Sequence, residues 1–244
     1  MSEREEVLLE RAFVLHHRPF RNTSQLLDCI TERHGRVGLV ARGSRRPRAG
    51  RRALLQPFQE LKVSWVRRGE LGTLTHVEAG SAGRQLRGDR LLAGYYVSEL
   101  VLRLLARGDA NREAFSCYSA CLHALADGAG IARTLRLFEL DMLHALGYGL
   151  GLDRDVDSGE PLETDASYAF EAESGLRRTA APADGRERFR GRDLIALREK
   201  ALDDAESLRA ARALLDRALQ TYLGERPLRS RGVFKDIHDR GLDR

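Results

Sequence analysis

The chain has 244 residues with a formal net charge of +5, and 42% of the residues are hydrophobic while 32% are charged. This composition is typical of a soluble globular protein with one large domain or two modest ones. No apolar run approaches the roughly 18 residues of a membrane-spanning helix, and the N-terminus lacks the apolar core of a secretory signal. The three cysteines form no disulfide framework, so we expect a protein of the reducing cytoplasm.

The positive charge is concentrated in the first third of the chain. Residues 1–80 contain 15 Lys and Arg against 9 Asp and Glu, whereas residues 81–244 contain 26 against 27. This asymmetry predicts a basic domain at 1–80 joined to a nearly neutral domain at 81–244.

The basic domain is expected to form a small closed barrel of five strands. Short runs of β-forming residues alternate with turns that contain Gly, Pro or Asn, a spacing typical of small barrels. Pro57 should lie at an edge or a bulge, because proline cannot donate to a strand ladder. The expected strands are 11–17, 23–31, 36–42, 54–66 and 71–79.

After residue 80 the hydrophobic period changes from two to about 3.6, which indicates helices. The predicted fold class is therefore α+β, with a helical domain that carries an acidic loop and a small β-hairpin at about 151–190. The expected hairpin pairs 167–171 with 176–179. The expected helices are 90–107, 111–126, 131–146, 192–200 and 204–223, with a short amphipathic piece at 233–238.

An arginine-rich loop follows the third strand, and no Asp or Glu occurs between Arg33 and Gln59. So many like charges repel one another, which favours contact with a polyanion; the alternative is a solvated loop without a partner. Because loops beside such barrels bind oligonucleotides, we expect backbone contacts without sequence preference. The candidate residues are Arg36, Arg42, Arg45, Arg46, Arg48, Arg51, Arg52, Lys62, Arg67 and Arg68. The aromatic residues of the domain are Phe13, Phe20, Phe58 and Trp65, and most of them are expected in the core.

Two further patterns favour structural over metal-binding interpretations. Cys117, Cys121 and His123 have helical spacing but lie among apolar residues, which favours buried packing over a metal site. The run of Asp153, Asp155 and Asp157 resembles the start of a calcium loop but lacks the rest of that pattern, so an acidic surface loop is expected. No motif for a catalytic site is present, and we expect neither an enzyme nor a cofactor.

Five segments spread along the chain resemble the RecO family of bacterial recombination mediators. They are RAFVLHHRPFRNTSQLLDCITERHGRVGLVARGSRR, ALLQPFQELKVSW, GELGTLTHVEA, LRLFELDMLHALGYG and YLGERPLRSR. The resemblance implies an oligonucleotide-binding barrel followed by a helical domain. It also implies binding of single- and double-stranded DNA, strand annealing, and loading of recombinase onto strands coated by single-strand-binding protein. The implied partners are RecR and the C-terminal tail of that coating protein, and the implied place is the nucleoid.

This chain departs from some family members, which carry a four-cysteine zinc site in the region of 150–190. No cysteine occurs there, so the hairpin is expected to be held by packing without zinc.

The resemblance also implies a receptor for an acidic tail that ends in an aromatic residue with a free carboxylate. An apolar pocket with an arginine at its rim suits that tail. The expected receptor comprises Arg133, Arg136, Leu137 and Leu140, with Arg229 and Arg231 as an alternative rim. A solvated helix surface is the plain alternative. For the whole chain, the rival functions are an RNA-binding or ribosome-associated barrel and, with less support, a nuclease.

Overall fold

The computed structural model describes residues 4–46, 51–80, 85–172, 174–179, 188–224 and 228–230. The chain forms two compact units. Unit 1 extends to Ala129 and includes Leu228–Ser230, whereas unit 2 begins at Gly130. The change of period at residue 80 therefore does not coincide with the division between the units, because two helices after it group with the barrel.

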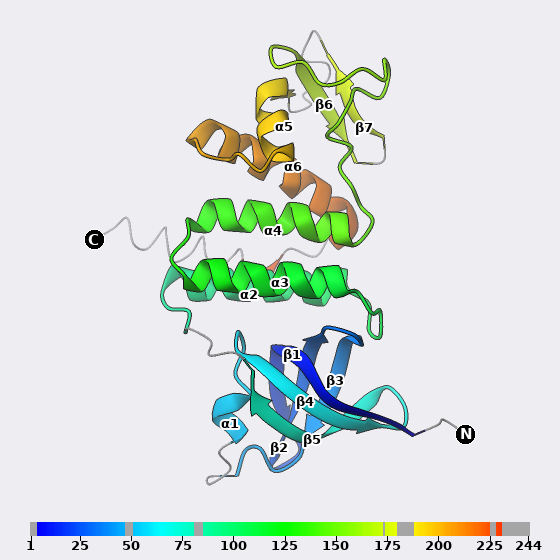
Figure 1. The fold of residues 1–244 in the computed structure, drawn as a ribbon, viewed down its shortest axis with the longest axis vertical. Coiled ribbons are helices and arrows are strands. Elements are labelled where there is room, and N and C mark those ends of the chain that lie inside the picture. Colours follow the sequence, from blue (N-terminus) through cyan, green and yellow to red (C-terminus); the bar gives the residue numbers. More distant parts are fainter. Residues whose placement is uncertain are drawn as a thin grey trace. The chain divides into compact units, whose positions relative to one another are not determined.

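The first five strands of unit 1 form a closed barrel, as the sequence predicts (Figure 1). Their order around the barrel is β1, β2, β3, β5, β4. All neighbours are antiparallel except β3 and β5, which run parallel. The strands are β1 (Glu5–Phe20), β2 (Ser24–Thr31), β3 (Gly35–Ala41), β4 (Glu60–Arg67) and β5 (Leu71–Ala79).

Strand β1 closes the barrel because it pairs with two neighbours along its length. Its first part, Glu5–Phe13, pairs with β4, and its second part, Ala12–Phe20, pairs with β2. Bulges interrupt the register between Val7 and Glu10 and between Val14 and His16, which lets the strand bend from one partner to the other. The sequence prediction missed the first half of this strand, since the bulge breaks the alternation there.

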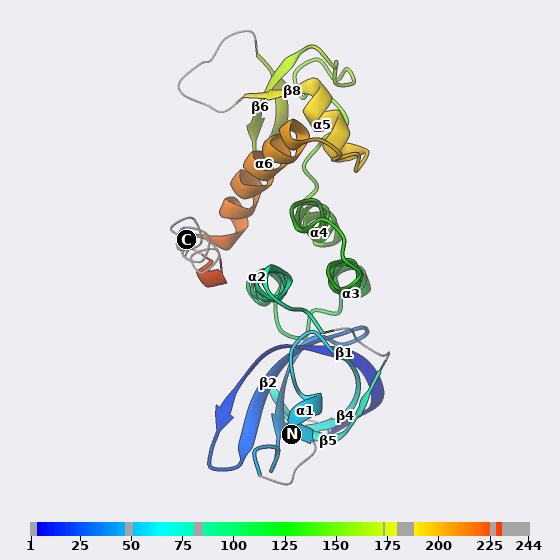
Figure 2. The ribbon, with the colours of Figure 1, turned by 90° about the vertical axis from the view of Figure 1, so that its left-hand side faces the viewer.

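The segment before β4 also differs from the prediction. Residues Arg51–Leu54 form a short helix, α1, and β4 begins only at Glu60, with Pro57 in the turn between them. Figure 2 looks at one opening of the barrel, and α1 lies across it. Leu55, directly after α1, is fully buried in the barrel core, so this apolar segment closes the end of the barrel.

Helices α2 (Asp89–Leu104) and α3 (Arg112–Ala126) complete unit 1. Phe13 of β1 packs against two aromatic rings of α3, with centroids 5.6 Å from Phe115 and 5.3 Å from Tyr118. The hydroxyl groups of Tyr118 and Ser98 are hydrogen-bonded at 2.8 Å inside this contact. Phe13 and Trp65 are both buried, as predicted, but Phe13 joins the barrel to the helices rather than filling the barrel.

Unit 2 combines three helices with a small antiparallel sheet. Its elements are α4 (Ile131–Ala145), β6 (Ser167–Glu171), β7 (Gly175–Arg178), β8 (Arg188–Arg190), α5 (Gly191–Arg198) and α6 (Ala205–Leu223). The predicted hairpin corresponds to β6 and β7, and β8 adds an unpredicted third strand on the other side of β6. The predicted amphipathic piece at 233–238 lies outside the described residues. None of the described helices combines the length and the apolar character needed to cross a membrane.

A buried carboxylate supports the bulge of β1. Glu10 is fully buried, and it accepts hydrogen bonds from the backbone N–H of Arg33 at 2.6 Å and from Nε of Arg33 at 2.7 Å. Leu9, just before it, has a φ of +48°, a left-handed conformation that is costly for a leucine. The ion pair therefore fixes the strained residue and the β2–β3 turn together.

We expect Glu10→Gln to lower the free energy of unfolding by about 2 kcal/mol, because the amide cannot accept both Arg33 hydrogen bonds and its own N–H₂ would meet donors. Urea denaturation measures the change. The matched control is Glu6→Gln, an exposed position in the same strand without an ion pair among the described residues. Equal stability of the two variants would contradict the role of Glu10.

The sheet of unit 2 is held by packing and by carboxylates, one of which is buried. Tyr168 and Phe170 of β6 and Leu176 of β7 are buried. Asp155, which is also buried, accepts hydrogen bonds from the Ser158 hydroxyl at 2.7 Å and from the Arg178 backbone N–H at 2.9 Å. It thereby ties the acidic loop to β7. Asp153 and Asp157 are exposed, as predicted for a surface loop, whereas Asp155 is buried.

The hydrogen bond from Ser158 lowers the pKa of Asp155, assisted by backbone N–H groups and opposed by burial. A carboxyl whose folded pKa lies below its unfolded value stabilises the fold above about pH 4, and this stability is lost as the pH falls. We expect Asp155→Asn to speed amide exchange in β6 and β7 about tenfold at pH 7, the effect of one lost charged hydrogen bond. Asp153→Asn, at an exposed neighbour, is the control, and unchanged exchange in the Asp155 variant would refute the role.

Candidate nucleic-acid interface

A groove of about 550 Å³ opens at one end of the barrel strands. It lies where the β1–β2 turn, the end of β3 and the start of β5 meet, because the β1–β2–β3 meander brings that turn and the loop after β3 to the same end. The groove is lined by Phe20, Arg21, Thr23, Ser24, Val40, Arg42, Gly43, Arg46 and Thr73. Three of these nine described lining residues are arginines and none of the nine is acidic, which suits an anionic ligand.

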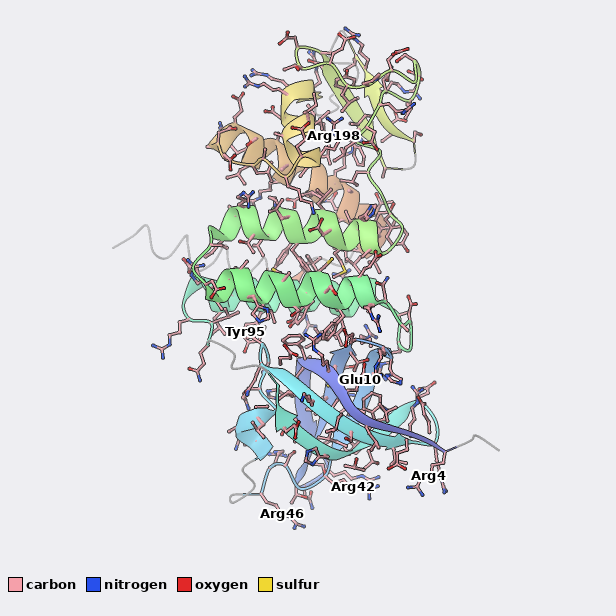
Figure 3. The ribbon with its side chains drawn as sticks, in the orientation of Figure 1. Arg4, Glu10, Arg42, Arg46, Tyr95 and Arg198 are labelled. Carbon is pink, nitrogen blue, oxygen red and sulfur yellow. The ribbon has the colours of Figure 1, made fainter. Side chains whose placement is uncertain are left out.

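The loop after β3 is built so that its arginines point outward. Gly43 takes a φ of +70°, which favours glycine, and the Ser44 hydroxyl donates to the Ala41 carbonyl at 3.0 Å. The backbone N–H of Arg45 donates to the Thr23 carbonyl at 2.9 Å, which ties the loop to the β1–β2 turn. In Figure 3, Arg42 and Arg46 lie at the edge of the barrel and extend away from it.

Three exposed arginines that line this groove, and a fourth, Arg45, in the same loop as two of them, carry uncompensated charge. Arg21, Arg42, Arg45 and Arg46 are exposed, and no carboxylate of the described residues forms an ion pair with any of them. The Arg21 guanidinium lies 5.4 Å from the centre of the Phe20 ring, a cation–π contact that holds the arginine at the groove wall. These four residues are called the groove arginines below.

Other predicted DNA-binding residues lie in different surroundings. Arg36 donates to the Leu102 carbonyl of α2, and burial lowers the pKa of its guanidinium, so this arginine joins the barrel to the helix. Arg67 forms an ion pair with Glu5 at 2.5 Å, and Lys62 lies 3.7 Å from Glu78. Arg68 is exposed and has no ion pair among the described residues. We therefore omit Arg36 from the candidate interface and regard Arg67 and Lys62 as already neutralised.

The remaining predicted arginines follow the loop. Arg48 lies outside the described residues. Arg51 and Arg52 begin α1 instead of continuing the loop, which corrects the prediction for this stretch. Burial lowers the pKa of His17 below its usual value, and the charges of His16 and Arg52 lower it further. Arg52 thus adds its charge to the same end of β1 that leads to the groove.

Sequence analysis missed Arg21, although it had assigned the β1–β2 turn. The sequence could have indicated Arg21, because an antiparallel meander of three strands places the first turn beside the end of the third strand. The arginine-rich run indicates only one loop, whereas the groove is formed by the β1–β2 turn, the loop after β3, the end of β3 and the start of β5.

The predicted receptor residues for an acidic tail are not equivalent. Arg136 is 7% exposed and forms an ion pair with the buried Glu139 at 2.5 Å, with Asp216 a further 3.9 Å contact. The charge of Arg136 is therefore neutralised by carboxylates of unit 2, and the structure does not support this residue as the rim of a pocket. Arg133 donates to the Lys200 carbonyl at 2.8 Å but stays exposed. Leu137 and Leu140 are half-buried.

The alternative rim lies in unit 1. The backbone N–H groups of Arg229 and Ser230 each donate to Glu99 of α2 at 2.9 Å. Burial alone would raise the pKa of Glu99, but these bonds and the Ser230 hydroxyl hold it below its usual value. The Arg229 side chain is exposed and has no ion pair among the described residues. Arg231 lies outside them.

The cysteines and the histidine of α3 differ in burial: Cys117 is half-buried and His123 is exposed, so the prediction of buried packing is wrong for these two. Cys121 is buried, and the His123 ring lies 2.8 Å from the Ser119 carbonyl of the preceding turn. In the part of the chain that the structure describes, no three His, Cys, Asp or Glu side chains are grouped so that they could hold a metal ion.

Comparison with known proteins identifies the family. A model described as "Recombination protein O N terminal" matches residues 6–81, and one described as "Recombination protein O C terminal" matches residues 85–232. The chain belongs to the RecO family. A protein of Methylococcus capsulatus named DNA repair protein RecO is 41% identical over 229 residues, which cover 94% of this chain and 93% of that protein. Its namesake in Laribacter hongkongensis is 43% identical over 244 residues, covering 97% and 98%.

Membership of the RecO family agrees with the barrel and the helical region that follows it. A third relative, from Serratia proteamaculans, bears the same name and is 43% identical over 93% of both chains. Because these relatives are named for DNA repair, the RNA-binding or ribosomal alternative is not favoured.

Proposed function

We propose that this protein is a non-enzymatic DNA-repair mediator that binds single- and double-stranded DNA through the groove arginines. The observation that carries the proposal is their uncompensated charge around a groove whose described lining residues include no acidic side chain. The groove arginines would bind the phosphates through charge, and every nucleotide carries the same phosphate, so binding should not depend on the DNA sequence. DNA as the substrate also fits the names of the relatives.

The same surface supports annealing. Two complementary strands repel each other through their phosphates, and a fixed array of cations lowers that repulsion while the strands find their register. The groove arginines are exposed and anchored by backbone contacts such as Arg45 to Thr23, so they can hold a strand without enclosing it. A mediator of this kind would then help load recombinase at the nucleoid, with RecR and the coating protein's tail as proposed partners.

Replacing Arg21, Arg42, Arg45 and Arg46 with Ala should weaken binding to single-stranded DNA and flatten its salt dependence. If all four contact phosphates, the slope of log K against log salt should fall in magnitude by about 0.7 for each, or roughly 3 in total. The fold should persist, because exposed side chains bury little apolar surface. Fluorescence anisotropy over a salt series measures both quantities, and a strand-annealing assay should show a parallel loss.

A matched control removes the same charge elsewhere. The control replaces four arginines of unit 2 with Ala and so removes the same number of positive charges. Each of them forms an ion pair with a carboxylate; they are Arg177, Arg178, Arg190 and Arg198. This control should retain most of the salt slope. If both variants lose the same slope, net charge rather than the groove governs binding, and the proposed interface is wrong.

The tail of the single-strand-binding protein is proposed to contact Arg229 rather than Arg136, because Arg136 is buried against Glu139 while the Arg229 guanidinium is exposed. Arg229→Ala should weaken binding of a labelled tail peptide by about 1 kcal/mol, the upper value for one exposed ion pair. Arg133→Ala is the comparison. Full affinity in the Arg229 variant, with loss in the Arg133 variant, would move the receptor to α4.

A further inference from the structure

A second cavity, of about 370 Å³, lies in unit 1 between the segment around α1 and the start of α2. Among the residues that the structure describes, its wall contains two aromatic residues, three glutamines and several apolar side chains, and none of these lining residues is charged. This composition differs from that of the groove, where arginines dominate. The cavity is large enough for a small planar ligand and too neutral to attract a phosphate.

The Tyr95 ring offers a stacking surface. Tyr95 is 47% exposed, and its ring centroid lies 5.0 Å from that of Phe58 at an interplanar angle of 74°. An edge-to-face contact of this kind occupies at most one face of the Tyr95 ring, so another face can receive a planar group. Figure 3 shows Tyr95 projecting from α2 at the surface of unit 1.

The backbone on both sides holds this arrangement in place. Phe58 has a φ of +70°, an unfavourable conformation for a non-glycine residue that directs the ring toward α2. On the helix, a Cβ at Gly94 would lie 3.0 Å from Phe58 Cε1 and 2.8 Å from Leu86 Cδ1. The absence of a side chain at Gly94 therefore lets Phe58 and Leu86 pack against the helix, which fixes one wall of the cavity.

Three amide groups supply polar partners. The side-chain amides of Gln59 and Gln85 make no hydrogen bond among the described residues, and Gln56 uses only its Nε2, which donates to the Arg52 carbonyl at 2.7 Å. An amide presents a donor and an acceptor together, as does the edge of a nucleobase. Stacking surface and neutral donor–acceptor groups are thus combined in one cavity.

We propose that this cavity binds one unpaired nucleobase of single-stranded DNA, stacked on Tyr95 with its edge toward the glutamine amides. The inference rests on the proposed DNA-binding function, since the strand would reach the cavity from the groove arginines. Helix α1 lies between Arg46 and Tyr95 in the view of Figure 3, and its Arg52 adds a cation on that path. A paired base cannot enter, so the cavity favours single strands over duplex.

The test compares two oligonucleotides of equal length, one of thymidylate and one whose sugar-phosphates carry no bases. Both have the same phosphates, so their affinity ratio isolates the contribution of the bases. The wild-type chain should bind the thymidylate about tenfold more tightly, as expected for one stacked base. Tyr95→Ala should bring this ratio close to one without changing the salt slope, while Tyr95→Phe, which keeps the ring, should retain the ratio.

The variant in which all four groove arginines are replaced with Ala separates this inference from the proposed function. It should lose affinity for both oligonucleotides and keep their ratio, so its failure to do so would count against the groove alone. A wild-type ratio in a folded Tyr95→Ala variant would overturn the nucleobase site. So would a Tyr95→Ala variant that loses affinity for the tail peptide but keeps the ratio, because the cavity would then belong to a protein partner.

Discussion

The bend of β1 is the constraint on which the barrel depends. One strand pairs with both β4 and β2, and its geometry is irregular on each side of the change of partner, between Val7 and Glu10 and between Val14 and His16. The buried carboxylate of Glu10 stabilises that bend by binding Arg33 of the β2–β3 turn. Because the strain and the ion pair occur at the same place, closure of the barrel and the position of the turn are coupled.

Ion pairing also divides the arginines of unit 1 into those with a carboxylate partner and those without a described one. Glu5, Glu10 and Glu60 neutralise Arg67, Arg33 and Arg11 on the walls of the barrel. No described carboxylate pairs with the arginines around the β1–β2 turn and the loop after β3. Four arginines without a described carboxylate partner therefore lie around one end of the barrel, although Arg4 and Arg68 also lack such a partner elsewhere, and this placement gives the electrostatic field a direction that net charge alone does not reveal.

Sequence periodicity predicted most strands and helices because alternation and the 3.6 period record which faces are buried. It missed the start of β1, where a bulge breaks alternation, and helix α1, where an apolar segment closes the barrel end. It also treated all arginines alike. Arg36 bonds to Leu102 and Arg136 to Glu139, and such partners become adjacent only through tertiary packing. For the same reason a change of period at residue 80 could not reveal that α2 and α3 pack with the barrel.

The groove and the cavity have complementary physical properties. A cation at a phosphate does not distinguish a single strand from a duplex, since both present the same backbone charge. An aromatic ring beside neutral amides responds to the base, and only an unpaired base can reach it. Both surfaces lie in unit 1. Salt would weaken the phosphate contacts in the groove far more than the base contact in the cavity. A protein that anneals strands needs separate contacts for phosphates and for bases, because it must hold an unpaired strand firmly and then release the duplex once the bases are paired.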